Sequence, residues 1–168
     1  MKLIDIGGFN GDSALHFIAY PDIDAVDVYE PNTAFKNIWK AIEEYYPSVR
    51  FIPKAVYTHN GTVEYHKRPD DNPLGSTIMK EKIQNDESHP IIVDCVDILD
   101  IVPDEPYCLK IDAEGAEYDI LERLIVEGKA NNIDRLYVEW HDGKMTSDNF
   151  ARQMAIINYF GKRVKSWL

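Results

Sequence analysis

The chain has 168 residues, of which 45% are hydrophobic and 28% are charged, and its formal net charge is −11. This size and composition predict a globular domain with one sizeable core. The acidic balance argues against the broad basic face that nucleic-acid binding normally needs, and no apolar run reaches membrane length. No secretory hydrophobic segment precedes the first predicted strand, and Cys95 and Cys108 lack a metal-type spacing. We therefore expect a single cytoplasmic domain over 1–168, with no nucleic-acid partner, membrane span or disulfide framework.

The first predicted element is a buried strand over 1–6, which runs into a glycine-rich turn and then a short helix over 13–20. The glycines of this turn allow a sharp bend and a close approach to a ligand. They are Gly7, Gly8 and Gly11. We expect Asp12 or Ser13 to cap the helix, because the free N–H groups of a helix start suit such a cap or an anionic ligand.

Two acids sharpen this pattern. Asp5 lies inside the first strand, and Glu30 follows the second predicted strand, 25–29, about 20 residues after the last glycine of the turn. An acid at that distance holds a ribose diol in nucleotide-binding βαβ units. The pattern therefore predicts a nucleotide-type cofactor.

The next predicted helix is capped by Asn32 or Thr33 and stopped by Pro47. It has an apolar stripe at helical spacing, which we expect to face the core. The stripe comprises Phe35, Ile38, Trp39, Ile42 and Tyr45.

A third strand is predicted over 49–52, continuing through 54–57. Asn60-Gly61 then favours a small hairpin between Val56-Tyr57 and 62–65. The stretch 66–90 lacks clear periodicity and includes Gly75-Ser76-Thr77, so we expect a long lid-like loop there.

The second half of the chain alternates strands with helices. We predict strands at 91–96, 107–111 and 136–138 and an edge strand over 163–168. A short turn or helix is predicted at 97–101. Longer helices are predicted at 117–127, closed by Gly128, and at 148–160, with Phe150, Met154 and Ile157 on one face. This order indicates an α/β fold with a doubly wound, mostly parallel sheet of the Rossmann-like type.

Ligands bind such sheets beyond the carboxyl ends of the strands. Several polar side chains are expected to converge there with the glycine turn and Glu30. These are Asp112 and Glu114 after one strand, and Glu139 and His141 after the next. A group of acids at one edge is costly unless it binds cations or polar ligands.

Four motifs together resemble the FkbM-type methyltransferases, which are class I enzymes that use S-adenosylmethionine. They are IDIGGFNGDS at 4–13, YEPN at 29–32, LKIDAEGAE at 109–117 and LYVE at 136–139. Residues 75–77 and 96–100 also match in order, so the resemblance covers roughly residues 3 to 142. Known members mostly methylate hydroxyl groups, often on sugars or polyketide-type products. The chain begins at its first strand, so we expect the leading segment that commonly helps to cover the site to be absent.

The resemblance implies roles by position. The glycine turn would line the methionine end of the cofactor, with Asp5 behind it. Glu30 would hold both ribose hydroxyls, and Ala55 would lie beside the adenine. Asp112 would lie beside the sulfonium methyl. The complete implied cofactor-binding set is Asp5, Gly7, Gly8, Phe9, Asn10, Gly11, Asp12, Ser13, Glu30, Pro31, Ala55 and Asp112.

The acceptor hydroxyl must lose a proton during transfer. Asp112 and His141 are the candidate bases, since a positioned base assists proton removal and histidine titrates near neutral pH. A Mg²⁺ or Mn²⁺ ion held by Asp112, Glu139 and His141 would acidify the alcohol instead.

The sequence thus predicts an S-adenosylmethionine-dependent O-methyltransferase that acts on a hydroxyl of a small molecule or carbohydrate, and that could form a homo-oligomer. One alternative is a cofactor-binding subunit that needs a partner chain for its acceptor site. A nicotinamide-dependent dehydrogenase is a second alternative, although its G-x-G-x-x-G fingerprint fits the glycine turn poorly.

Overall fold

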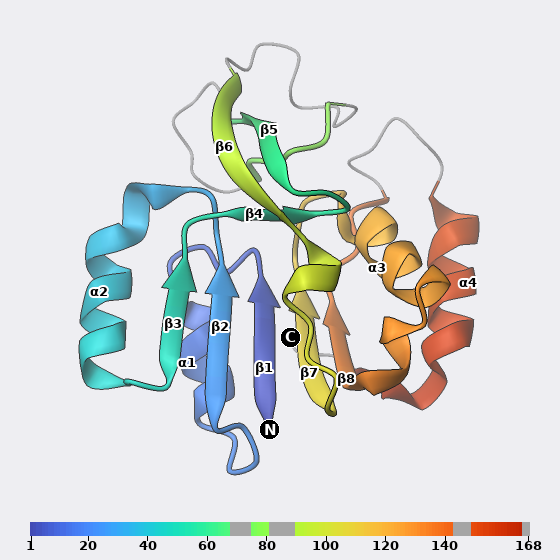
Figure 1. The fold of residues 1–168 in the computed structure, drawn as a ribbon, viewed down its shortest axis with the longest axis horizontal. Coiled ribbons are helices and arrows are strands. Elements are labelled where there is room, and N and C mark those ends of the chain that lie inside the picture. The colour runs from blue at the N-terminus through green and yellow to red at the C-terminus, as the bar shows by residue number, and fades with distance from the viewer. Residues whose placement is uncertain (68–74, 81–89, 143–148, 166–168) are drawn as a thin grey trace.

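The computed structural model describes residues 1–67, 75–80, 90–142 and 149–165. Its main sheet has six strands, and each strand is parallel to its neighbours (Figure 1). In spatial order the strands are β3 (Val49–Ile52), β2 (Ala25–Tyr29), β1 (Lys2–Ile6), β7 (Tyr107–Ile111), β8 (Ile133–Val138) and β9 (Val164–Lys165). The predicted α/β class is confirmed, and the order reverses between β1 and β7, which is where such sheets bind ligands.

Helices cover both faces of this sheet. They are α1 (Asp12–Ile18), α2 (Lys36–Tyr45), α3 (Glu117–Val126) and α4 (Phe150–Phe160), with 3-10 turns η1 (Thr33–Phe35), η2 (Ile98–Asp100), η3 (Lys129–Asn132) and η5 (Gly161–Arg163). Side chains alternate along β1, so Leu3 packs in the cluster of α1 and α2, whereas Ile4 packs in the cluster of α3 and α4. Both residues are fully buried, which makes β1 the centre of the core.

A second sheet lies across the carboxyl ends of the main strands (Figure 1). It contains β4 (Ala55–Tyr57), β6 (Pro90–Asp97) and β5 (Gly61–His66), in that spatial order. Strand β6 is parallel to β4 and antiparallel to β5. The edge of the main sheet where a ligand is expected therefore has a β-sheet above it.

The predicted continuation of the third strand through 54–57 is wrong. Strand β3 ends at Ile52, and Lys54 donates a backbone hydrogen bond back to the Ile52 carbonyl at 2.8 Å. Pro53 has no N–H to extend the ladder. The chain therefore turns there, and Ala55–Tyr57 pairs in the second sheet.

The predicted hairpin around Asn60-Gly61 is also wrong, because β6 lies between β4 and β5. Both strands exist, but the Asn60 side chain binds the end of β6 rather than closing a two-residue turn. Its Oδ1 accepts from the Asp97 N–H at 3.0 Å, and its Nδ2 donates to Asp100 Oδ2 at 2.6 Å. Strand β6 therefore pairs with both β4 and β5, in place of the predicted pairing of β4 with β5.

The predicted caps and apolar faces need correction at several positions. Gly11, with φ of +97°, is the N-cap of α1, and no side chain in the described part of the chain caps this helix. Ser13 instead donates its hydroxyl to Asp5, whereas Asn32 does cap η1. Four residues that we assigned to buried or shared apolar faces are exposed, namely Ile38, Tyr45, Phe150 and Met154. The buried face of α4 is instead formed by Ile156 and Phe160, which lie on a different side of the helix from Phe150 and Met154.

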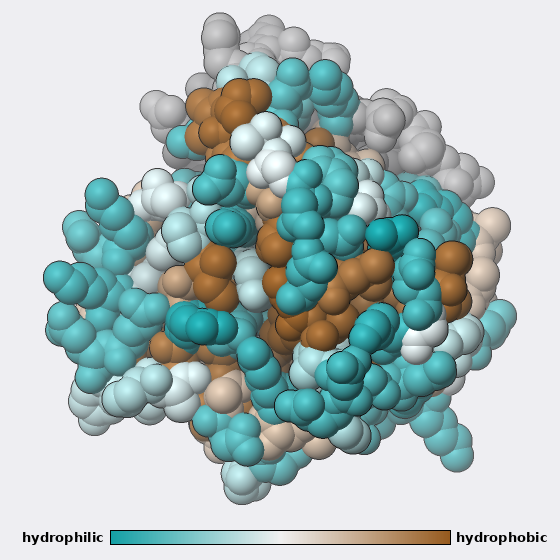
Figure 2. Space-filling view, viewed as in Figure 1, coloured by the Kyte–Doolittle hydropathy of each residue, from teal (hydrophilic) through white to brown (hydrophobic). Residues whose placement is uncertain are grey.

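The predicted lid-like loop lies partly outside the described residues, which include 75–80 but neither 68–74 nor 81–89. Within the described part, His66 and Thr77 form an isolated antiparallel bridge. The predicted edge strand is confirmed at 164–165, and residues 166–168 lie outside the description. Figure 2 shows hydrophobic residues gathered over η2 and α3 and at the outer end of β6, where Ile91 and Ile92 are exposed.

Candidate functional site

A pocket lies where the carboxyl ends of β1, β2 and β7 meet the second sheet. It is lined by Ile6, Gly7, Phe9, Tyr29, Glu30, Pro31, Ala55, Val56, Tyr65, Gly75, Ser76, Thr77, Ile78, Asp112, Ala113, Glu114 and Ala116. These residues come from six separated parts of the sequence, brought together by the parallel strand ends and by the second sheet above them. This is the place at which a doubly wound sheet binds its ligand.

The glycine turn after β1 is packed directly against the backbone after β7. Gly7 has φ of +79°, and a Cβ built on it would lie 1.9 Å from the Asp112 carbonyl oxygen. Its N–H donates to the Tyr29 carbonyl at 2.9 Å. Only glycine satisfies both the positive φ and this close approach. The turn therefore holds the ends of three strands together at the base of the pocket.

A buried ion pair supports the turn from behind. Lys110 Nζ lies 3.0 Å from Asp5 Oδ1 and donates to the Gly7 carbonyl at 2.8 Å. The Ser13 hydroxyl donates to the other Asp5 oxygen. Asp5 is fully buried and does not line the pocket, so its contacts indicate support of the turn rather than direct contact with a ligand. Sequence analysis gave Lys110 no role, although a lysine inside the apolar strand YCLKI was a signal that a buried partner exists.

Glu30 presents a buried carboxylate at the end of β2. Its Oε2 accepts from the Phe9 N–H at 3.1 Å and its Oε1 accepts from the Asn32 N–H at 2.6 Å. Burial raises the pKa of this carboxyl to about 7, although the two backbone N–H groups and Lys110 oppose that rise. A carboxylate held by one N–H on each oxygen is fixed in orientation and keeps free lone pairs for further donors.

Asp112 and Glu114 line the opposite wall, after β7. Burial raises the pKa of Asp112 to about 6, with Lys110 as the largest opposing influence. Glu114 has φ of +51°, and its carbonyl accepts from the Thr77 hydroxyl at 2.8 Å. The segment around Thr77 is thus joined to the β7 end of the site.

His141 lies behind these acids and does not line the pocket. It is 2% exposed, and its Nδ1 lies 3.1 Å from Glu117 Oε1. Burial alone would lower the pKa of His141, but the hydrogen bond and charge of Glu117, with Glu114 and Asp112, outweigh it and raise the pKa. Sequence analysis assigned no role to Glu117, which is the first residue of α3 and fully buried.

The predicted site residues divide into two groups. Those that line the pocket are Gly7, Phe9, Glu30, Pro31, Ala55 and Asp112, whereas Asp5, Gly8, Asn10, Gly11, Asp12, Ser13, Glu139 and His141 do not. Asn10 bonds Asp12 through its side chain at 2.9 Å, in an exposed position. Residues that sequence analysis did not place in the cofactor site, notably Tyr65 and the 75–78 segment, complete the wall. Of the glycine motif after β1, only Gly7 and Phe9 therefore line the pocket.

The family model described as the methyltransferase FkbM domain matches residues 5–164. The chain belongs to this family. The Rossmann-like core, the glycine turn and the acidic end of β7 all lie within the matched range.

Comparison with solved structures gives a match to a crystal structure of a methyltransferase FkbM from Methylobacillus flagellatus KT. The two share 17% sequence identity with a TM-score of 0.60, over 94% of this chain and 36% of that one. At this identity the likeness shows the fold, and the chain spans about a third of the length of that protein. Comparison with curated proteins gave no match. Among the described residues, no helix has the length and apolarity needed to cross a membrane.

Proposed function

We propose that this chain is an S-adenosylmethionine-dependent O-methyltransferase acting on a hydroxyl of a small molecule or carbohydrate, with residues 1–168 as one methyltransferase domain. The observation on which the proposal rests is the fixed Glu30 carboxylate in the pocket wall, opposite Asp112 and beside the Gly7 turn. In nucleotide-binding βαβ units an acid at this position hydrogen-bonds the ribose of the cofactor. The site fits S-adenosylmethionine because an acid, a glycine turn and an apolar wall border one cavity.

Each part of the pocket then has a proposed role. Glu30 accepts hydrogen bonds from both ribose hydroxyls with the lone pairs that Phe9 and Asn32 leave free. Ala55, from the second sheet, contacts the adenine, and the backbone from Gly7 to Phe9 borders the methionine end. Asp5 and Lys110 hold that backbone in place from the core side.

The cofactor supplies an activated methyl group on a sulfonium. The protein's task is to align the acceptor oxygen with that methyl, exclude water and take up the hydroxyl proton as the O–C bond forms and the S–C bond breaks. We propose that Asp112 lies at the acceptor oxygen, because it lines the pocket at the end of β7. It takes the proton itself, or it contributes to a cation site that lowers the pKa of the hydroxyl.

Turnover on the isolated chain tests this proposal. A screen over glycans and small alcohols, with detection of S-adenosylhomocysteine, should give product in the presence of S-adenosylmethionine for the correct acceptor class. The control is Asp112→Asn, which should bind cofactor without turnover.

A second candidate is a cofactor-binding subunit whose acceptor site needs another chain or a further segment. The observation that favours it is the 36% coverage of the longer FkbM structure. Cofactor binding without turnover on any acceptor would support this candidate if a second protein or a second copy of this chain restored turnover.

We also propose that the protein works in a reducing compartment such as the cytoplasm, because Cys95 and Cys108 are both buried free thiols.

A further inference from the structure

The ring of His141 is oriented by a buried carboxylate. Glu117 Oε1 accepts from the His141 backbone N–H at 3.0 Å and lies 3.1 Å from its Nδ1, while Oε2 accepts from the Gly115 N–H at 2.8 Å. Glu117 is fully buried and sits at the start of α3. Since its carboxylate is fixed by two backbone donors, it accepts a hydrogen bond from Nδ1–H of the imidazole, and Nε2 is the ring nitrogen on the far side.

That nitrogen points into a group of acids. His141 Nε2 lies 3.4 Å from Glu114 Oε2, 3.6 Å from Asp112 Oδ1 and 3.6 Å from Glu139 Oε1. The atom is buried and makes no hydrogen bond to any described residue. Carboxylates grouped around one buried nitrogen are costly unless positive charge lies among them, and a bound cation would supply that charge.

We propose that Asp112, Glu114 and His141 form a divalent-cation site whose preferred ion is of the Mn²⁺ type. Ligand atoms from these three residues all lie within 4.8 Å of one another. On an ion with bonds of about 2.1 Å, adjacent ligands are about 3 Å apart and opposite ligands about 4.2 Å apart, so small side-chain movements close the site. The hydrogen bond from the imidazole to Glu117 is the carboxylate–histidine–metal arrangement common in metal sites.

The donor set favours Mn²⁺ over Mg²⁺. One imidazole nitrogen with two carboxylate oxygens suits a borderline transition ion, whereas Mg²⁺ prefers oxygen ligands throughout. The site differs from our sequence expectation in one ligand, because Glu114 takes the place of Glu139 in the compact group. Glu139 lies near enough to contribute negative charge, and its side chain is 40% exposed.

The position of the site relates it to the pocket. Asp112 and Glu114 line the pocket while His141 lies behind them, so the open coordination positions of an ion would face the cavity. A hydroxylated acceptor would bind there through oxygen. That role depends on the proposed methyl-transfer function, whereas binding of the ion itself does not.

Titration with Mn²⁺ alone, followed by electron paramagnetic resonance of the free ion, tests the proposal on the metal-stripped chain. We expect one saturable Mn²⁺ site per chain. Its affinity for Mn²⁺ should be about tenfold or more below the wild-type value in Asp112→Asn and in Glu114→Gln. Glu117→Gln should weaken binding about 10- to 100-fold by releasing the imidazole. Mg²⁺ should compete only at much higher concentration.

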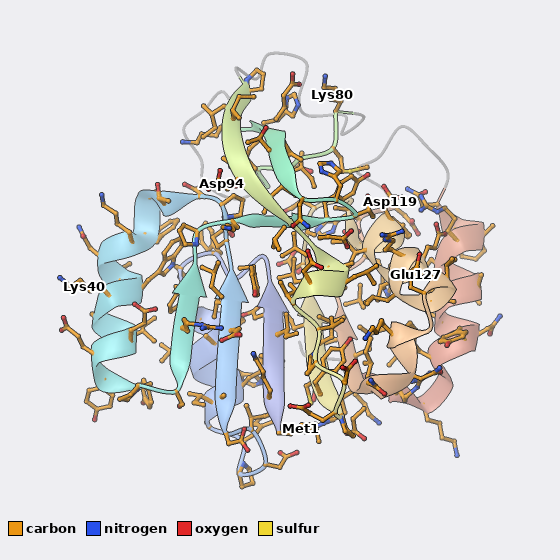
Figure 3. The ribbon with its side chains drawn as sticks, in the orientation of Figure 1. Met1, Lys40, Lys80, Asp94, Asp119 and Glu127 are labelled. Carbon is orange, nitrogen blue, oxygen red and sulfur yellow. The ribbon has the colours of Figure 1, made fainter. Side chains whose placement is uncertain are left out.

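The control is Glu127→Gln, at the far end of α3 in Figure 3, which removes an exposed charge and should leave Mn²⁺ affinity unchanged. Circular dichroism of each variant establishes that it is folded, and the isosteric amides keep the test valid if His141→Ala fails to fold. No saturable Mn²⁺ binding by the wild type, or an affinity in Glu114→Gln and Asp112→Asn equal to that of the wild type, would overturn the proposal. Calorimetry with S-adenosylmethionine in chelator on the same samples separates this failure from failure of the proposed function.

Discussion

Lys110 and Asp5 form a fully buried ion pair, with 3.0 Å between Nζ and Oδ1, on adjacent strands of the main sheet. The same lysine donates to the Gly7 carbonyl at 2.8 Å. The pair therefore joins the centre of the sheet to the turn that forms the base of the pocket. Neither residue contacts the cavity, so their substitution should act first on stability and on the shape of the turn.

Lys110→Met should strongly destabilise the chain, because it leaves the Asp5 carboxylate buried without its cation. We expect a loss of about 3–5 kcal/mol in the free energy of unfolding, measured by denaturant titration. The matched control is Lys2→Met, which removes a partly exposed lysine from Asp27 while Arg50 stays bound to the same acid. It should cost about 1 kcal/mol or less. Equal losses in the two variants would contradict the role given to the buried pair.

Gly7→Ala should prevent the turn from packing against β7. The added Cβ would lie 1.9 Å from the Asp112 carbonyl oxygen at a φ of +79°. Gly128→Ala provides the control, since its φ is +73° and an added Cβ meets nothing within 4 Å. Backbone strain alone should cost Gly128→Ala about 1–2 kcal/mol. Thermal unfolding should show a clearly larger loss for Gly7→Ala, and similar losses would mean that the close approach is unimportant.

Stability should fall as pH rises through the range in which Glu30 ionises. Burial raises the pKa of folded Glu30 to about 7 from its ordinary value of 4.5, so the folded state favours the protonated form. The stabilisation is present at low pH, declines above about pH 4.5 and is lost beyond about pH 7, an effect on the order of 3 kcal/mol. Glu30→Gln should flatten this part of the pH profile, with Asp5 and Lys110 as the charged neighbours that both proteins keep. An unchanged slope between pH 5 and 8 would contradict the assignment.

Asp112→Asn should abolish most turnover while sparing affinity for S-adenosylmethionine, because Asp112 lines the pocket and we propose that it lies at the acceptor oxygen. Chelation distinguishes the two ways in which it could act. A direct base is indifferent to chelator, whereas a cation ligand predicts that wild-type activity is lost in chelator and restored by Mn²⁺. The control is Asp94→Asn on the outer surface of β6, where the side chain is exposed (Figure 3). Near-normal turnover by Asp112→Asn would show that both roles are wrong.

The parallel sheet was predictable from the sequence because its strands are short apolar runs that end at polar turns. The ranges predicted for β2 and β7 agree with the structure at both ends, and the glycines after β1 mark the turn. The second sheet was not predictable in the same way. Its register depends on β6, about 30 residues after β5 begins, and local turn signals at Asn60-Gly61 favour a nearer partner.

The candidate site was predictable only in part, for a related reason. Acids at strand ends mark Glu30 and Asp112, since every parallel strand ends at the same edge. Burial and pairing depend on neighbours from distant segments. The contact of Lys110 with Gly7 and the orientation of His141 by Glu117 are therefore visible only in three dimensions. The same holds for the grouping of Glu114, rather than Glu139, with Asp112 and His141.

Calorimetric titration of the wild type and Glu30→Ala with S-adenosylmethionine, and in parallel with NAD, tests the central claim most directly. We predict that S-adenosylmethionine binds the wild type much more tightly than NAD does. Glu30→Ala should remain folded and bind S-adenosylmethionine about tenfold or more weakly, because a charge-assisted hydrogen bond is worth about 1.5–3 kcal/mol. Tighter binding of NAD than of S-adenosylmethionine, or unchanged affinity in Glu30→Ala, would contradict the account.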